Sequence, residues 1–511
     1  MRPRNAHAHN KIFGVAMNVE PVDMHGKTVH KKIEMKAHLS SMAYTYIFFF
    51  FRKTIAVSSS SSVGSRRLFA AATSRHDISN SKESQDNNMN SPLQDYLDDI
   101  VGADKEIPGM QYVVVDKDSV LFSYAGGIRD TASQTEKTTN DNNAVTDTTR
   151  FLSSSCTKVL TATAIWKLIK QGKIESVQDP LSRYFDQHPY GGNDDNRNTA
   201  SKTTETTTTI QLLHLLNHSS GCPHPLPFNQ NWLHTFINEH HTSYSEADSL
   251  RTVLQANPKL SFSPAGQRYA YSNVGYWLLG KVIETASGMS YREYLQQEIL
   301  QPLGIPKEEL DTEFDETQPL DLSYARGHQE RWSFMTGVFR LLTRRQLWDA
   351  SAGKWARFQF LCMNGPAYGG IMGTATGYSK FLQDFLKEES NSKLFGSSKD
   401  DGKTSIRQRM LWEEQRDATG NLMPSTLGGW VRKELSVASD NDKSTSSTHK
   451  YFGKPGGGPG FHSNVRIYPE AGIATVYLCN KTQVSEGPIN ALSDLLDGKF
   501  FQERGNQETD D

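Results

Sequence analysis

Ser155 and Lys158 are the first residues whose types and spacing could perform chemistry. They form a Ser-x-x-Lys motif at the start of a predicted helix over 156–170. A spacing of three residues puts the hydroxyl and the amine on one helix face. Serine is a weak nucleophile until a base takes its proton, and a partly desolvated lysine can be that base. Because four other Ser-x-x-Lys matches lie in linker-like or loop-like sequence, the motif alone is a weak signal.

Tyr271 and Asn273 form a second candidate motif, directly before a predicted helix over 274–287. A tyrosine beside lysines is expected to have its phenolate form favoured, so that it can relay a proton. An asparagine can hydrogen-bond to a lysine and to a substrate carbonyl. The alternative interpretations are a half-buried aromatic residue for Tyr271 and a helix N-cap for Asn273.

Lys454 begins a third motif, the segment KPGGGPGF at 454–461, which leads into a predicted strand over 465–468. The lysine can supply positive charge, and neighbouring backbone N–H groups can bind an oxyanion. Glycines on a strand usually mark the close approach of a ligand or of another backbone segment. The alternative is a flexible glycine-rich turn.

The ordered trio of motifs resembles the serine β-lactamase and penicillin-binding-protein superfamily, and most closely its class C β-lactamase-related esterase and peptidase branch. The segments LLHLLNHSSG (212–221), YSNVGYWLLG (271–280) and GGIMGTATGYSKFL (369–382) are similar to the same family. The resemblance extends from about 108 to 481, interrupted by polar insertions. It implies an α+β fold of the β-lactamase/transpeptidase type, with an antiparallel sheet flanked by helices and a mostly helical lobe.

The resemblance also implies roles for individual residues. Ser155 would be the acylated nucleophile, Lys158 its base or proton partner, and Tyr271 the general acid/base. The backbone N–H groups of Ser155 and Gly457 would form the oxyanion hole. The substrate-binding residues would be Asn273, Lys454, Gly456 and Gly457. No metal and no organic cofactor is implied.

One departure from the family pattern concerns the middle residue of Lys-x-Gly. It is often Thr or Ser in true β-lactamases, where its hydroxyl helps to hold the antibiotic carboxylate, but it is Pro455 here. We therefore expect a serine hydrolase that acts on ester or peptide-like amide bonds. The alternatives are a true β-lactamase, a D-Ala-type carboxypeptidase or transpeptidase, and a non-catalytic binding or filament-forming protein on the same fold.

The strand and helix pattern supports the same fold class. Predicted strands at 110–115 and 120–124 near the start, and at 465–468 and 474–478 near the end, enclose a series of predicted helices. Such an order predicts an α+β fold whose sheet joins the two ends of the chain. We expect one two-lobed catalytic domain over 91–502 and a disordered C-terminus over 503–511. Polar loop insertions in the catalytic domain are predicted near 131–149, 191–209, 387–407 and 436–450.

Residues 1–90 are predicted to be a disordered tail or a targeting segment for a mitochondrion or another organelle, because 35–75 is basic, serine-rich and free of acidic residues. The apolar run at 44–51 is too short to span a membrane. The net charge of −2 gives no support for a nucleic-acid partner. The expected partner is a small-molecule or peptide substrate, and the oligomeric state stays open.

Three residues near these motifs are expected to have packing roles. His214 lies in a short predicted helix over 210–217, and His218, four residues further on, would share one helix face with it. In the resembling family this helix is structural. Cys156, next to the candidate nucleophile, is interpreted as a small packing residue and not as a second nucleophile.

Overall fold

The computed structural model describes most of the chain from residue 91 onward, with short gaps. The described residues are 91–131, 143–190, 209–224, 236–237, 245–312, 323–333, 336–337, 340, 347–349, 351–360, 362–396, 404–438, 446–482 and 490–510. The predicted targeting segment, and most of the predicted insertion at 191–209, lie outside these residues.

A six-stranded antiparallel sheet with the order β10-β11-β12-β13-β1-β2 forms the centre of the fold. Strand β1 of the N-terminal hairpin pairs with β13 near the C-terminus, with Val113 opposite Val476. The sheet therefore joins the two ends of the domain, as the sequence predicts. Its strands are β1 (Gly109–Val115), β2 (Val120–Gly127), β10 (Val431–Ala438), β11 (Ser446–Gly458), β12 (Phe461–Tyr468) and β13 (Ile473–Cys479).

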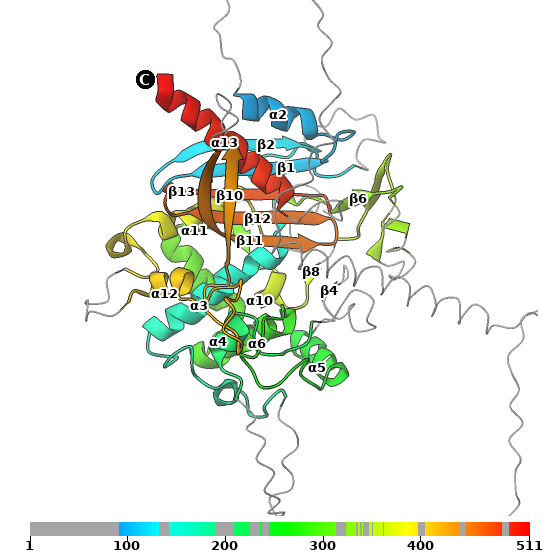
Figure 1. Ribbon diagram of the computed structural model, residues 1–511. Coiled ribbons are helices and arrows are strands. Elements are labelled where there is room, and N and C mark those ends of the chain that lie inside the picture. The colour runs from blue at the N-terminus through cyan, green and yellow to red at the C-terminus, as the bar shows by residue number, and fades with distance from the viewer. Residues whose placement is uncertain are drawn as a thin grey trace, which may run out of the picture. The chain divides into compact units, whose positions relative to one another are not determined.

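Helices cover both faces of this sheet (Figure 1). Along β1, alternate residues enter two different cores, because successive side chains of a strand point to opposite faces. Met110, Tyr112 and Val114 pack with α2 (Pro92–Ile100) and α13 (Ala491–Asp510), whereas Val113 and Val115 belong to the larger core of the helical lobe. The expected α+β architecture is confirmed.

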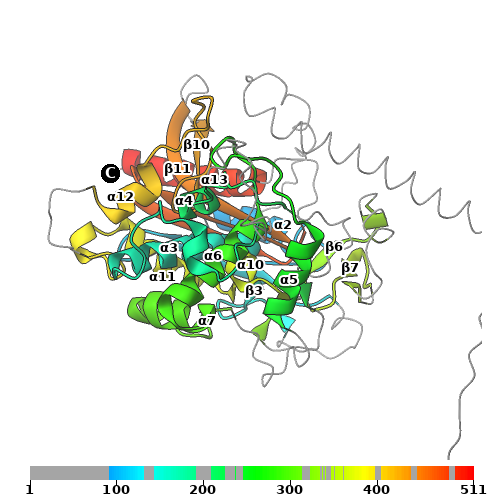
Figure 2. The same cartoon turned by 90° about the horizontal axis from the view of Figure 1, so that it is seen from below.

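The helical lobe lies below the sheet in Figure 1 and in front in Figure 2. Its centre is α3, which packs against α6 and α10. Its helices include η4 (Ser154–Cys156), α3 (Thr157–Lys170), α4 (Leu212–Leu216), α5 (Glu246–Ala256), α6 (Asn273–Ser287), α7 (Tyr291–Tyr294), η8 (Leu295–Leu300), α10 (Pro366–Gly369), α11 (Ala375–Leu386) and α12 (Ile406–Trp412).

A small second sheet anchors the segment that precedes α3. Strand β9 (Met372–Gly373) pairs on one side with β3 (Phe151–Leu152) and on the other with β5 (Leu310–Asp311). Just after β3, Ser153 Oγ hydrogen-bonds to the Ile371 carbonyl at 2.9 Å. The chain therefore enters η4 from a fixed position.

Three boundaries differ from the sequence predictions. In the predicted insertion at 436–450, the described residues 436–438 and 446–450 are strand, because β10 and β11 pair up to Ala438 opposite Ser446. Helix α13 continues to Asp510, through most of the C-terminus predicted to be disordered. The polar run 387–407 contains the short helix η11 (Glu389–Asn391), where Asp384 accepts a hydrogen bond from Ser392 Oγ. In each case the polar composition predicted a loop or disorder. These polar segments are ordered instead by strand pairing or by packing against the domain.

Candidate active site

Ser155 lies in η4, directly before α3, and its hydroxyl has two polar neighbours. Tyr271 Oη is 2.7 Å from Ser155 Oγ, and Lys158 Nζ is 3.2 Å from it. Lys158 lies within the first turn of α3, so the expected shared helix face exists. The first two motifs, more than 100 residues apart in the chain, therefore meet at one hydroxyl.

Lys158 is fully buried and has two further hydrogen-bond partners. Its Nζ donates to Asn273 Oδ1 at 2.8 Å and to the Tyr368 carbonyl at 2.6 Å. Burial, followed by repulsion from Lys454, holds the pKa of Lys158 well below its usual range. A neutral amine has two N–H donors and one lone pair. With the donors used by Asn273 and Tyr368, the lone pair is left for the Ser155 hydroxyl.

Asn273 is positioned by the start of α6. The N-cap of this helix is Ser272, whose hydroxyl accepts from Gly275 N–H at 3.1 Å. Asn273 is the first helical residue, and its side chain bonds to Lys158. The alternative interpretation of Asn273 as the N-cap is therefore wrong, since the cap lies one residue earlier.

Tyr271 is neutral in this environment, contrary to the expected phenolate. Burial raises the pKa of its hydroxyl, and the hydrogen bond with Ser155 lowers the pKa by less. The Nζ atoms of two lysines lie over its ring face, that of Lys158 at 5.0 Å and that of Lys454 at 5.4 Å from the centroid. The sequence argument failed because it counted the nearby charges and not the cost of burying a phenolate.

Lys454 lies on β11, and only 2% of the residue is exposed. Burial lowers the pKa of Lys454 to about 8. In the described part of the chain no carboxylate forms an ion pair with Lys158 or with Lys454. Uncompensated buried positive charge favours a negatively charged group nearby. The site is therefore suited to an oxyanion or a substrate carboxylate.

The segment Lys454–Gly458 forms an open edge of the sheet. Its strand pairs with β12 throughout, with Lys454 opposite Val465, whereas pairing with β10 ends at Gly453. A proline is tolerated at such an edge because its missing N–H is not needed by a neighbouring strand. The strand edge therefore accommodates Pro455.

Two glycines allow this edge to lie against η4. A Cβ atom at Gly456 would be 2.2 Å from the Ser153 carbonyl oxygen, and one at Gly458 would be 2.6 Å from Ser154 Oγ. Gly457 instead faces open space, because a Cβ atom placed there would have no neighbouring atom within 4 Å. The sequence signal for close backbone approach is therefore confirmed at Gly456 and Gly458.

Ser154, which precedes the candidate nucleophile, has a strained backbone. Its φ of 48° lies in the left-handed region, which is unfavourable for residues other than glycine. Its hydroxyl is buried and has no hydrogen-bond partner among the residues that the structure describes. Strained residues of this kind cluster at functional sites, where the surrounding structure fixes them.

Cys156 has the packing role expected from the sequence. Its thiol is buried and donates to the Lys454 carbonyl at 3.0 Å. Burial raises the pKa of the thiol to about 12. A protonated, inaccessible thiol is not a nucleophile, and it links α3 to β11.

Two histidines beside Tyr271 were not predicted to belong to the site. The ring of His218 lies 4.4 Å from that of Tyr271, and the ring of His224 lies 5.3 Å from it. The expectation that His218 shares a helix face with His214 is wrong, because α4 ends at Leu216. The sequence contained a signal for this helix end, because the segment after the helix is polar and contains a glycine. Such a segment ends the helix before His218.

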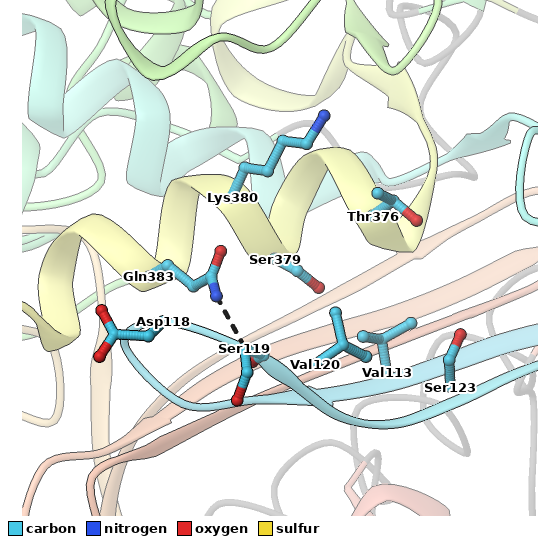
Figure 3. Close-up of a pocket in the computed structure, with 9 residues that line it drawn as sticks. All are labelled: Val113, Asp118, Ser119, Val120, Ser123, Thr376, Ser379, Lys380 and Gln383. Atoms are coloured by element: carbon cyan, nitrogen blue, oxygen red, sulfur yellow. Dashed lines mark hydrogen bonds between the residues drawn. The ribbon is translucent and has the colours of Figure 1, made fainter.

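A separate pocket lies between α11 and the β1–β2 hairpin, lined by residues such as Val113, Ser123, Thr376 and Lys380 (Figure 3). Its volume of about 170 Å³ is small for a ligand site. Strands β12 and β13 separate β1 from β11. The pocket therefore contains none of the three motifs, and we assign it no part in the candidate chemistry.

Two further observations concern metals and membranes. Within the described ranges no group of three or more His, Cys, Asp or Glu side chains is arranged to hold a metal ion. None of the helices in those ranges is both long enough and apolar enough to cross a bilayer.

Comparison with known proteins agrees with this fold. Residues 94–498 match the family described as Beta-lactamase. Penicillin-binding protein 4* of Bacillus subtilis is 29% identical over 186 residues, which is 36% of this chain and 34% of that protein. The D-alanyl-D-alanine-carboxypeptidase/endopeptidase AmpH of Escherichia coli is 28% identical over 197 residues, 39% of this chain and 44% of that protein. The chain thus spans less than half the length of these curated relatives.

Solved structures share the fold. The octameric penicillin-binding protein homologue from Pyrococcus abyssi aligns with a TM-score of 0.54 and 21% identity, covering 79% of this chain and 77% of that one. The D-amino acid amidase from Ochrobactrum anthropi aligns with a TM-score of 0.55 and 18% identity, covering 81% and 98%. At these identities the likeness concerns the fold alone.

Proposed function

Because the chain belongs to the β-lactamase family, we propose that it is a serine hydrolase that cleaves ester or peptide-like amide bonds through a covalent acyl-enzyme on Ser155. The observation that carries this proposal is the pair of contacts at Ser155 Oγ, to Tyr271 Oη at 2.7 Å and to Lys158 Nζ at 3.2 Å. A nucleophile needs a base within hydrogen-bond reach, and both neighbours are in reach.

In the first half of the reaction, Ser155 Oγ attacks the substrate carbonyl carbon and its proton passes to Lys158 Nζ. The low pKa of Lys158 supports this role, because only a neutral amine can accept the proton. The oxyanion that forms is bound by the backbone N–H groups of Ser155 and Gly457. Lys454 adds positive charge nearby.

The leaving group then departs as the carbonyl bond to nitrogen or oxygen breaks. It takes a proton from Tyr271 Oη, and the proton that Lys158 Nζ took from Ser155 passes to the tyrosine oxygen and restores its hydroxyl. Water next attacks the acyl-enzyme, the ester bond to Ser155 breaks, and the serine hydroxyl is restored. The raised pKa of Tyr271 suits a neutral hydroxyl that donates a proton to the leaving group and not a standing phenolate base.

A carboxypeptidase acting on D-amino-acid peptides is the second candidate. The name of the relative AmpH of Escherichia coli supports it, and so does the buried positive charge of Lys454, which favours a substrate carboxylate. The proline at position 455 favours such substrates over β-lactam antibiotics. A non-catalytic protein would have no need to keep Ser155, Lys158 and Tyr271 in mutual contact.

Turnover of three substrate classes tests the proposal and separates the candidates. Purified protein is compared with its Ser155→Ala variant on p-nitrophenyl esters, peptides ending in D-alanine, and the β-lactam nitrocefin. Hydrolysis of an ester or peptide that is lost in Ser155→Ala supports the proposal. Turnover that persists unchanged in Ser155→Ala, or none with any class, contradicts it.

A further inference from the structure

His218 and His224 enclose the Tyr271-Ser272-Asn273 segment, although neither touches Ser155 in the described contacts. The His218 ring lies against Tyr271 at 4.4 Å between centroids and an interplanar angle of 38°. The His224 ring meets Tyr271 edge-on, at 5.3 Å and 82°. The phenol ring is thus contacted by two imidazoles from a separate segment, 218–224.

The histidines also accept hydrogen bonds from the backbone of this segment. Ser272 N–H donates to His218 Nδ1 at 3.2 Å, and Asn273 N–H donates to His224 Nδ1 at 3.4 Å. The His218 carbonyl oxygen accepts from Ala270 N–H at 2.8 Å. His218 therefore holds the chain on both sides of Tyr271, once through its side chain and once through its backbone.

His218 itself is held in a costly conformation. Its φ of 61° lies in the left-handed region. The conformation is fixed by Asn217 Oδ1, which accepts from the Ser219 N–H at 3.1 Å and from the Ser219 hydroxyl at 2.6 Å. His218 Nε2 is buried and has no partner among the described residues, which is a further cost. Stability alone does not account for a residue with these two penalties.

We infer that His218 and His224 are positioning residues that hold Tyr271 and Asn273 in reach of Ser155 and Lys158. This inference rests on the proposed function of those residues. An imidazole Nδ1 that accepts a backbone N–H must carry no proton, so both side chains act as neutral acceptors. Burial, reinforced by Lys454 and then Lys158, holds the pKa of His218 well below its usual range, and burial followed by Lys158 lowers the pKa of His224 to about 4. The contacts are therefore kept at neutral pH.

Two substitutions at His218 separate positioning from packing. His218→Phe keeps an aromatic ring against Tyr271 but removes the Nδ1 acceptor. His218→Asn loses the ring but supplies an amide oxygen for Ser272 N–H, and asparagine tolerates left-handed backbone. His224→Phe repeats the acceptor loss at the second site.

His214 provides a matched control. It is also a buried histidine, and its Nδ1 accepts a backbone N–H, that of Gln211, at 3.1 Å. It lies in α4 and makes no described contact with Tyr271. His214→Phe therefore reports the general effect of losing a buried histidine acceptor in this region.

The experiment measures kcat and KM on the best substrate, with thermal unfolding as a check on folding. Because a displacement of about 1 Å at a catalytic group costs roughly 100-fold, His218→Phe is expected to lower kcat by about 10- to 100-fold with KM little changed. His224→Phe should show a smaller fall in kcat. His218→Asn should recover most of the rate, and His214→Phe should keep it.

The possible results distinguish the two hypotheses. If wild-type protein shows no turnover that depends on Ser155, the proposed function fails. If wild-type turnover is normal and folded His218→Phe and His224→Phe match it, only the positioning role is overturned. The positioning role is also overturned if His214→Phe lowers kcat as much as His218→Phe and His224→Phe do. If His218→Phe does not fold, the variants His224→Phe and His218→Asn decide between the hypotheses. A normal kcat in His224→Phe overturns the positioning role. So does a kcat in His218→Asn that is lowered only in step with a lowered unfolding temperature.

Discussion

The hydroxyl oxygens of Tyr271 and Ser155 lie 2.7 Å apart, although 116 residues separate them in the chain. The contact joins the loop before α6 to η4, which leads directly into α3, and helices α3 and α6 pack against each other in the lobe. The packing of two helices thus sets the distance between a candidate nucleophile and its candidate proton donor.

Removal of the Tyr271 hydroxyl should impair catalysis without unfolding the protein. General acid–base groups contribute about 10²–10⁴-fold to rates, so Tyr271→Phe should lower kcat/KM by that order. Tyr291→Phe is the matched control, because it removes a buried tyrosine hydroxyl that bonds to Thr161 Oγ1 at 2.7 Å, away from Ser155. Equal kcat/KM values for the two folded variants would contradict the role of Tyr271.

The pH dependence of kcat/KM should reflect both lysines. Activity should rise with pH as Lys158 loses its proton, and this rise should lie well below the usual lysine range because the pKa of Lys158 is lowered. Activity should fall again near pH 8, the pKa at which Lys454 loses its charge. Lys454→Gln removes a positive neighbour, so the pKa of Lys158 should increase and the acid limb should move to higher pH.

Lys454→Arg serves as the control for this profile. It keeps a positive charge at alkaline pH, so the alkaline fall in activity should disappear in that variant. An acid limb at the same pH in wild type and Lys454→Gln would show that repulsion between the two lysines does not set the pKa of Lys158.

The ion pair between Arg466 and Asp497 should stabilise the contact of α13 with the sheet. Both side chains are fully buried and 2.8 Å apart, and Tyr468 Oη donates to Asp497 at 2.6 Å. Removal of one partner leaves a buried charge, so Asp497→Ala should lower the free energy of unfolding by about 3–5 kcal/mol. Urea denaturation measures this change.

Asp494→Ala is the control for this ion pair. Asp494 contacts the same arginine at 2.8 Å, but its side chain is 38% exposed. Its loss should therefore cost about 1 kcal/mol or less. A similar loss for both variants would mean that burial of Asp497 does not determine its contribution.

Pro455 should limit the recognition of β-lactams. Pro455→Thr supplies a hydroxyl beside Lys454, and a hydrogen bond to a charged group contributes about 1.5–3 kcal/mol. Nitrocefin hydrolysis relative to ester hydrolysis should therefore increase by about tenfold or more. Pro455→Ala restores the N–H without the hydroxyl and should not show the increase. If the ratio of nitrocefin to ester hydrolysis increases equally in Pro455→Thr and Pro455→Ala, the increase comes from the restored backbone N–H and not from the hydroxyl.

Much of the fold was predictable because it follows from local pattern. The apolar run of β1 and the helices that begin near Ser155 and Asn273 are evident directly in the sequence. The three motifs indicate the candidate site residues, which are Ser155, Lys158, Tyr271, Asn273 and Lys454. The close approach of backbone at Gly456 follows from the glycine run before β12. The structure brings these residues together as the motif order indicates.

The remaining features depend on tertiary contacts that no local pattern carries. The protonation state of Tyr271 depends on burial, and the contribution of the Tyr368 carbonyl to Lys158 depends on where α10 lies. His218 lies beyond the end of α4 because Asn217 and Ser219 form a turn there. The pairing of β10 with β11 likewise converts a polar run into strand.

The most direct test of the central proposal is the site of covalent labelling by a fluorophosphonate, determined by intact mass and peptide mapping. We expect one adduct per chain, on the peptide that contains Ser155, and no adduct in Ser155→Ala. A folded wild-type protein with Ser155 unlabelled, or with equal labelling in Ser155→Ala, would contradict the assignment of Ser155 as the nucleophile.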